Sequence, residues 1–222
     1  MKKLLPFFVI ILVTTVFGQS EQRKNPSDFL PRGYVLFENI YGDLNKDGFK
    51  DCIIIIKGTD KNKIIHDKSF GELDRNRRGL VVLFKNRENY ELVVKNLDCF
   101  SSENEDGGVY FPPELSVEIK KGNLYIHYSH GRYGYWRYTF RFRNSDFELI
   151  GYDGSSNRGP IVNSQTSINF LTEKKQIKEN LNEYPEQDPG DETFKETWKN
   201  IKANKLVKLS EVKDFDELDI SY

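Results

Sequence analysis

The chain has 222 residues, with 33 Lys and Arg against 34 Asp and Glu and a formal net charge of −1. Charges of both signs are interspersed and no basic patch stands out, so nucleic acid is not an expected partner. The length predicts one sizeable core, in a single β-rich domain over residues 19–222.

The first eighteen residues have the pattern of a secretory signal peptide. Lys2 and Lys3 precede an almost wholly apolar run over residues 4–17, and Val16 and Gly18 are small enough for signal peptidase. We therefore expect residues 1–18 to be cleaved before Gln19 and the protein to be exported, periplasmic or extracellular. The run is short for a membrane span and no cysteine near its end would anchor a lipid, so no span is expected after cleavage.

Apolar and alternating segments then follow one another as hairpins. Residues 52–57 (CIIIIK) form a continuous β-branched run, typical of a strand covered on both faces. Later segments pair across short turns, at residues 79–85 with 90–95, 115–120 with 123–129, 134–143 with 147–152, and 161–171 with 175–181. The predicted class is mainly β, an antiparallel meander over residues 33–181 that is propeller-like or closes as a sandwich or barrel.

Residues 134–143 show the clearest alternation. Trp136, Tyr138, Phe140 and Phe142 are predicted to face the core. The alternate set is predicted to face solvent and consists of Tyr135, Arg137, Thr139, Arg141 and Arg143. The following segment, residues 151–160, is rich in small polar residues and is predicted to be a loop.

The C-terminal part is predicted to be helical. Residues 182–190 form a polar linker, and Thr193 with Glu196 resembles a capping box. Phe194, Trp198 and Ile201 recur at helical spacing, so a short helix is expected within residues 191–222, followed by an acidic tail.

Cys52 and Cys99 are the only two cysteines. Export permits a disulfide between them, and two buried free thiols are the alternative. The spacing alone leaves both open, because geometry decides pairing.

The segment GDLNKDGFKD carries the strongest chemical signal. Counted from Asp43, positions one, three, five and nine are Asp43, Asn45, Asp47 and Asp51, with Gly48 at six. Alternate side chains of a tight loop can turn oxygens inward, and the carbonyl of Phe49 can add another. All-oxygen donors suit Ca²⁺ better than Zn²⁺. The EF-hand pattern needs Glu at position twelve, where this chain has Ile54 and a predicted strand.

This loop, with the apolar strand after it, resembles the calcium loops of FG-GAP and VCBS repeats, in a single copy over about residues 34–95. The resemblance implies structural calcium held by Asp43, Asn45, Asp47, Phe49 and Asp51, but not a complete propeller. The stretches SHGRYGYWRYTFRF and FELIGYD resemble uncharacterised secreted proteins of the Bacteroides type, which implies export and supplies no activity.

A second candidate site surrounds a glycine-containing turn. His127, His130, Arg132, Tyr133 and Tyr135 are residue types that bind sugars or partner proteins when exposed. Packing of these aromatic residues on the core is the alternative.

No nucleophile, zinc or phosphate-loop motif is present, and no catalytic residue is assigned. We therefore expect an exported, calcium-braced β-domain that binds a protein or glycan partner rather than an enzyme. Two alternatives stay open. A periplasmic hydrolase of envelope polymers predicts a deep cleft with a carboxylate pair or a His–carboxylate pair. An inhibitor-like module predicts a protruding loop, at residues 129–134 or 151–159.

Overall fold

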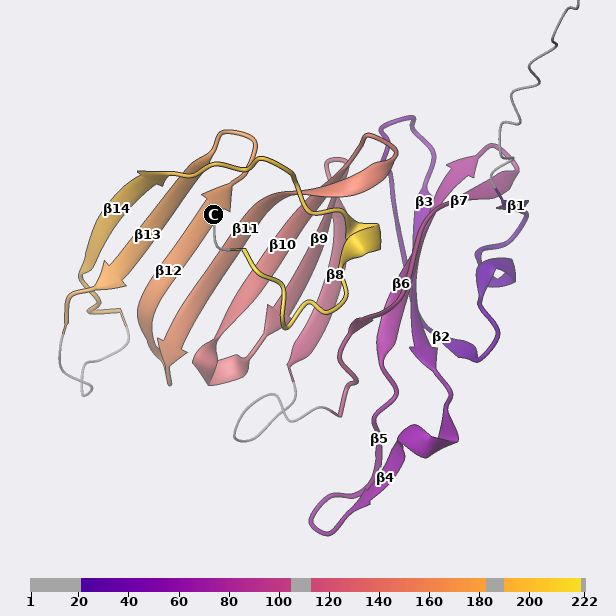
Figure 1. Cartoon of the computed structure of the whole chain (residues 1–222), viewed down its shortest axis with the longest axis horizontal. Coiled ribbons are helices and arrows are strands. Elements are labelled where there is room, and N and C mark those ends of the chain that lie inside the picture. The colour runs from indigo at the N-terminus through magenta and orange to yellow at the C-terminus, as the bar shows by residue number, and fades with distance from the viewer. Residues whose placement is uncertain (1–20, 105–112, 183–189, 221–222) are drawn as a thin grey trace, which may run out of the picture.

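The computed structural model describes residues 21–104, 113–182 and 190–220 and contains two main antiparallel sheets (Figure 1). The predicted signal peptide and most of the predicted linker lie outside the described residues. Within these ranges no helix has the length and apolar character needed to cross a membrane.

The first sheet has five strands in the order β1-β7-β6-β3-β2. All of its neighbouring strands are antiparallel. The strands and the short 3₁₀ turn near the start of this part of the chain are β1 (Gln22–Arg23), η1 (Pro26–Phe29), β2 (Tyr34–Gly42), β3 (Asp51–Gly58), β6 (Arg78–Asn86) and β7 (Asn89–Phe100).

A small hairpin stands apart from both main sheets. It consists of β4 (Ile64–Asp67) and β5 (Gly71–Asp74) and follows the 3₁₀ turn η2 (Lys61–Lys63). In Figure 1 it projects away from the rest of the molecule.

The second sheet has seven strands in strict chain order, from β8 at one edge to β14 at the other. This succession confirms the mainly β, antiparallel meander and its predicted hairpins. The elements are β8 (Glu114–Lys120), β9 (Asn123–Ser129), η3 (Gly131–Tyr133), β10 (Gly134–Arg143), β11 (Asp146–Arg158), β12 (Ile161–Asn169), β13 (Lys174–Asn180) and β14 (Phe194–Asn200).

The central strands of the five-stranded sheet are covered on both faces, as the CIIIIK run predicts. Ile53 and Ile55 of β3 join a large core shared with the seven-stranded sheet. Ile54 and Ile56 point the other way, into a smaller cluster that contains Phe29 of η1. Alternate side chains of one strand therefore pack in two separate cores.

Among the described residues, the seven-stranded sheet packs on the shared core through one face. In β10, Tyr138 and Phe140 are buried in the shared core, with Trp136 and Phe142 packed against it, as predicted. We call this face the inner face of the seven-stranded sheet and the opposite one the outer face.

The predicted C-terminal helix is wrong, because residues 194–200 form strand β14. Its backbone pairs with β13 in unbroken register from Phe194 to Asn200. A spacing of four residues places Phe194 and Trp198 on one side of a helix and equally on one side of a strand. The spacing of Phe194 and Trp198 therefore fits a helix and a strand equally. Backbone pairing with the edge of β13 favours the strand.

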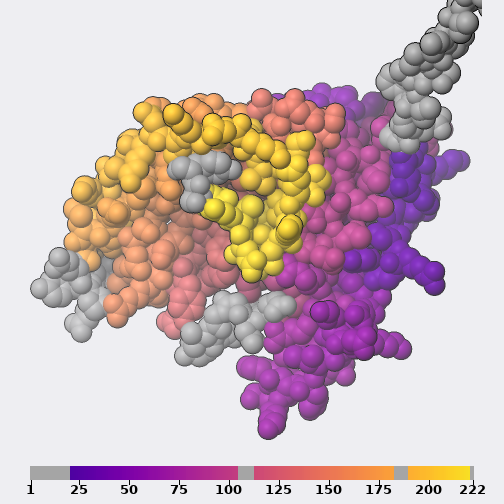
Figure 2. Space-filling model, viewed as in Figure 1, coloured from indigo at the N-terminus to yellow at the C-terminus, as the bar shows by residue number. Residues whose placement is uncertain are grey.

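The C-terminal segment after β14 returns across the inner face (Figures 1 and 2). It contains the 3₁₀ turn η4 (Leu209–Glu211) and buries Leu209, Val212 and Phe215 in the shared core. Phe215 stacks on Phe100 of the five-stranded sheet, with 5.2 Å between ring centroids, and lies 5.2 Å from Tyr138 of the seven-stranded sheet. This segment therefore connects the two sheets.

Two further expectations are settled by the fold. Residues 151–158, predicted as a loop, continue strand β11, because β10 and β12 pair with it on either side. Cys52 and Cys99 are free and buried, and they belong to different clusters on opposite faces of the five-stranded sheet. The alternative of two buried thiols is therefore the one observed.

Candidate functional site

The acidic loop connects β2 to β3. Asp43 follows the last residue of β2, and Asp51 is the first residue of β3. Lys46 and Gly48 adopt positive φ angles of 65° and 90°, which turn the chain sharply. The predicted bend at Gly48 is confirmed, and Lys46 makes a second one.

Side-chain oxygens hold this loop by binding its own backbone. Asp43 accepts hydrogen bonds from the N–H of Lys46 at 2.6 Å and of Gly48 at 3.0 Å. Asn45 accepts from the N–H of Asp47 at 3.0 Å, and Asp47 from that of Phe49 at 2.8 Å. These are Asx-type turns, in which the loop's own side chains fix the shape of its backbone.

Asp51 is the buried anchor of the loop. One carboxylate oxygen accepts the N–H of Leu44 at 2.7 Å, and the other accepts the N–H of Lys85 in β6 at 2.8 Å. Asp51 is fully buried, and desolvation raises the pKa of its carboxyl group against the opposing effect of these two bonds. The carboxylate thus ties the loop to the neighbouring strand.

The loop also contacts the seven-stranded sheet, at the turn between β8 and β9. A Cβ on Gly42 would lie 2.6 Å from Cγ2 of Ile119, and one on Gly122 would lie 2.4 Å from Cε of Lys46. A pocket of about 350 Å³ is lined there by Asp43, Lys46, Ile119, Lys121 and Gly122. The acidic loop therefore lies at a junction between the two sheets.

The residues of this loop fit calcium in donor type. Residues 43–51 offer carboxylate, amide and carbonyl oxygens, and an oxygen that accepts one backbone N–H keeps a second lone pair. In the described ranges, however, no three His, Cys, Asp or Glu side chains are grouped so as to hold a metal ion. Calcium binding would therefore require the acidic side chains of residues 43–51 to come closer together than they lie here.

The second candidate site is divided between two faces. The rings of His127 and Tyr135 meet on the outer face with centroids 5.3 Å apart. The ring of His130 instead stacks on Trp136 at 3.8 Å, on the side of the core residue Tyr128. Arg132 and Tyr133 lie exposed in the short turn η3.

The outer face also contains residues that the sequence reasoning did not select. Arg137 forms a salt bridge with Asp153 at 2.8 Å, and Asp153 accepts a hydrogen bond from Ser167 at 2.8 Å. The guanidinium of Arg137 lies 5.7 Å from the centroid of Tyr125. The alternation within each strand predicts that these side chains share a face, but their pairing between strands needs the register.

His127 and the two cysteines lack the surroundings that hydrolytic catalysis needs. The cross-strand neighbours of His127 are Ser116 and Arg137 rather than a carboxylate. Burial raises the pKa of the Cys52 thiol to about 11 and raises that of Cys99 as well, which disfavours either thiolate. The carboxyl group of Asp216, whose pKa burial raises, interacts electrostatically with His130, and the hydrolase hypothesis stays a prediction.

Comparisons of this chain with protein-family models, with curated proteins and with solved structures give no match in any of the three. Functional conclusions therefore depend on the geometry described above.

Proposed function

We propose that this protein is an exported β-domain that binds a protein or glycan partner. A calcium ion bound in the acidic loop would stabilise the domain, and we call this role the calcium brace. The observation that supports the brace is the position of the loop. It is tied to β6 through Asp51, lies against Ile119 of β8 at Gly42, and contacts Gly122 of the following turn through Lys46.

A calcium ion in this loop would be held by Asp43, Asn45, Asp47, the carbonyl of Phe49 and Asp51. It would offset the mutual repulsion of three carboxylates within nine residues and strengthen the junction between the sheets. A ligand that binds only the folded state stabilises it by about 2.7 kcal/mol when its free concentration is about 100 times Kd.

The test is thermal unfolding of the purified protein in calcium and in excess chelator. We expect a higher melting temperature in calcium for the wild type and no difference for the double variant Asp43→Asn, Asp47→Asn. Glu88→Gln, at an exposed acidic position outside the loop, is the matched control and should keep the calcium response. Equal melting temperatures for the wild type in calcium and chelator, with no calcium retained after purification, would refute the brace.

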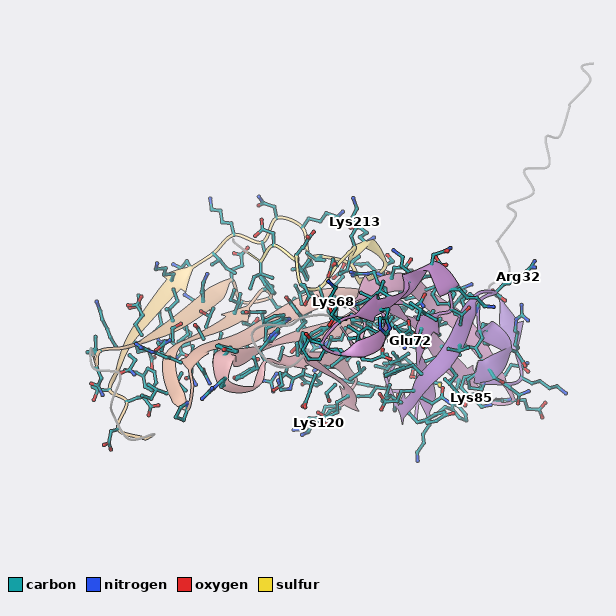
Figure 3. The ribbon with its side chains drawn as sticks, turned by 90° about the horizontal axis from the view of Figure 1, so that it is seen from below. Arg32, Lys68, Glu72, Lys85, Lys120 and Lys213 are labelled. Carbon is teal, nitrogen blue, oxygen red and sulfur yellow. The ribbon has the colours of Figure 1, made fainter. Side chains whose placement is uncertain are left out.

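A protein partner is supported by the hairpin of β4 and β5. Phe70 at its tip is 71% exposed, and Ile64 and Ile65 are 42% and 43% exposed. Figure 3 views the molecule from the side toward which this hairpin projects and labels its residues Lys68 and Glu72. Solvent-exposed apolar side chains on a protruding element are typical of contact sites.

Two sets of hydrogen bonds preorganise this hairpin. At the tip, Asp67 accepts the N–H groups of Ser69 at 2.7 Å and Phe70 at 3.0 Å. At the base, the side chain of Asn76 accepts a hydrogen bond from the N–H of Asp60 at 2.9 Å and donates one to its carbonyl at 3.0 Å. An isolated two-stranded hairpin is only marginally stable, so these bonds lower the entropy lost on binding. For the inhibitor-like hypothesis, residues 151–158 are part of strand β11 and not a protruding loop, residues 129–134 stay a candidate, and this hairpin is a further one that we propose.

Inhibition assays test this hypothesis with purified secreted proteases and muramidases as probes. We expect one of them to be inhibited by the wild type and at least tenfold less by Phe70→Ser, with the melting temperature unchanged. Leu171→Ser, which alters an exposed apolar side chain elsewhere, should inhibit like the wild type. Inhibition that Phe70→Ser leaves intact, or no inhibition of the panel, would count against a plug formed by the hairpin.

A further inference from the structure

The outer face of the seven-stranded sheet carries three parallel rows of side chains that run across the strands, with one residue from each strand in every row. The register of neighbouring strands defines them. The middle row is Ser116, His127, Arg137, Asp153, Ser167, Gln176 and Trp198. The flanking rows are Glu114, Ser129, Tyr135, Ser155, Gln165, Lys178 and Glu196, and Glu118, Tyr125, Thr139, Gly151, Asn169, Lys174 and Asn200.

The three rows contain no aliphatic side chain. Hydroxyls, amides and aromatic rings predominate, and these groups donate and accept hydrogen bonds without net charge. Asp153 joins the three central strands through its bonds to Arg137 and Ser167, both at 2.8 Å. This network fixes the orientation of polar groups in the middle of the face before any ligand arrives.

Aromatic rings lie on the second and third strands of this sheet and again on its far edge strand. His127 and Tyr135 are in contact, with Tyr125 on the other side of Arg137. Trp198 is 60% exposed on the edge strand. Rings of this kind offer a flat apolar face against which the C–H face of a sugar ring can pack, while neighbouring amides and hydroxyls bind its hydroxyl groups.

The charges of the three rows disfavour an ionic polymer. The three rows contain four carboxylates, at Glu114, Glu118, Asp153 and Glu196. Against them stand three cations, at Arg137, Lys174 and Lys178. Burial and the nearby Arg137 lower the pKa of His127, which keeps its imidazole neutral at neutral pH. The three rows together therefore carry little net charge, and neither attract polyanions nor repel a neutral chain.

The dimensions suit an extended chain. Neighbouring strands are about 4.8 Å apart, so the seven strands span about 29 Å. This spacing is close to the rise per sugar of an extended pyranose chain, so a chain running across the strands would place about one sugar over each strand.

We propose that the outer face of the seven-stranded sheet binds a neutral polysaccharide chain across its strands, with Tyr135 and Trp198 as stacking positions. This inference rests on the binding half of the proposed function and not on the calcium brace or the hairpin.

Affinity gel electrophoresis with soluble neutral polysaccharides (β-glucan, xylan, mannan and dextran), and with heparin and polygalacturonate as charged probes, tests the proposal. We expect at least one neutral polysaccharide to retard the wild type. Trp198→Ala and Gln176→Ala should each raise the apparent dissociation constant at least threefold, and together at least tenfold. Lys195→Ala, on the same edge strand but outside the three rows, should bind like the wild type.

Trp198 is largely exposed, so its loss should leave the melting temperature unchanged, and Gln176→Ala provides an independent variant. No retardation by any neutral polysaccharide, retardation by the charged probes alone, or binding that both variants leave intact would each overturn the proposal. Repeating the gels in chelator, and with the Phe70→Ser variant, distinguishes failure of this inference from failure of the calcium brace or of the hairpin hypothesis. Glycan binding that persists under both conditions leaves this inference standing even where the calcium brace or the hairpin hypothesis fails.

Discussion

Both sheets are antiparallel, but they differ in how many of their faces are covered by other parts of the protein. In the five-stranded sheet, β3 buries every side chain from Asp51 to Ile56, with Ile53 and Ile55 in the shared core and Cys52, Ile54 and Ile56 in the smaller cluster. In the seven-stranded sheet, β9 buries Leu124, Ile126 and Tyr128 and leaves the residues between them half-exposed. A strand covered on both faces has its side chains committed to packing, whereas a sheet covered on one face keeps the other available for recognition.

The C-terminal segment is the strongest test of this comparison, because it seals the inner face and joins the sheets. Phe215 is 1% exposed and packs against Phe100, Tyr138 and Phe140. We expect Phe215→Ala to lower the free energy of unfolding by about 3–5 kcal/mol, measured by urea denaturation. Glu217→Ala, an exposed change in the same segment, should stay within about 0.5 kcal/mol. A loss below about 1 kcal/mol for Phe215→Ala would show that the segment is not part of the core.

A pair of substitutions compares the two sheets directly. Ile54→Ala removes buried carbons from β3 and should cost about 2–5 kcal/mol of unfolding free energy. Gln165→Ala on the outer face of β12 should cost no more than about 0.5 kcal/mol. Equal losses in denaturant titrations would mean that the outer face is also packed, which contradicts its role as a free surface.

The sequence predicts the hairpins because their turn signals and alternation agree. Lys121 and Gly122 both have positive φ, as a two-residue hairpin turn requires. Prediction from the sequence fails at β14, where a four-residue apolar spacing suits helix and strand alike. It also fails at residues 151–158, where Gly and Ser indicated a loop. In both places the deciding factor is pairing with a strand that is distant in sequence, which local propensity does not contain.

The candidate sites show the same limit. The acidic loop is local, so spacing predicts its residues and its bend, and calcium there stays a prediction. The cluster from His127 to Tyr135 is close in sequence, but successive strand residues point to opposite faces, so His130 separates from His127. The row formed by Arg137, Asp153 and Ser167 could not be predicted, because a shift of one residue in register would remove it.

Asp51 gives a smaller test, at the place where the two sheets meet. Asp51→Asn keeps the size of the side chain but turns one acceptor into a donor, which leaves the N–H of either Leu44 or Lys85 without its partner. We expect a loss of about 1–3 kcal/mol of unfolding free energy, measured in chelator so that metal binding does not contribute. Glu118→Gln at an exposed position should change little. A neutral result for Asp51→Asn would show that the buried carboxylate does not anchor the loop.

The smallest expected effect concerns His127 and the charge of the outer face. Burial, and secondarily Arg137, lowers its pKa in the folded state, so the unfolded chain binds the proton more readily. Stability contributed by neutral His127 is therefore complete above the unfolded pKa of about 6.5 and declines as the pH falls through that value toward the folded pKa. The unfolding free energy of the wild type should fall more steeply between pH 7.5 and 5 than that of His127→Gln. Identical slopes would show that His127 titrates as in the unfolded chain, and the three rows of the outer face would then gain a positive charge at mildly acidic pH.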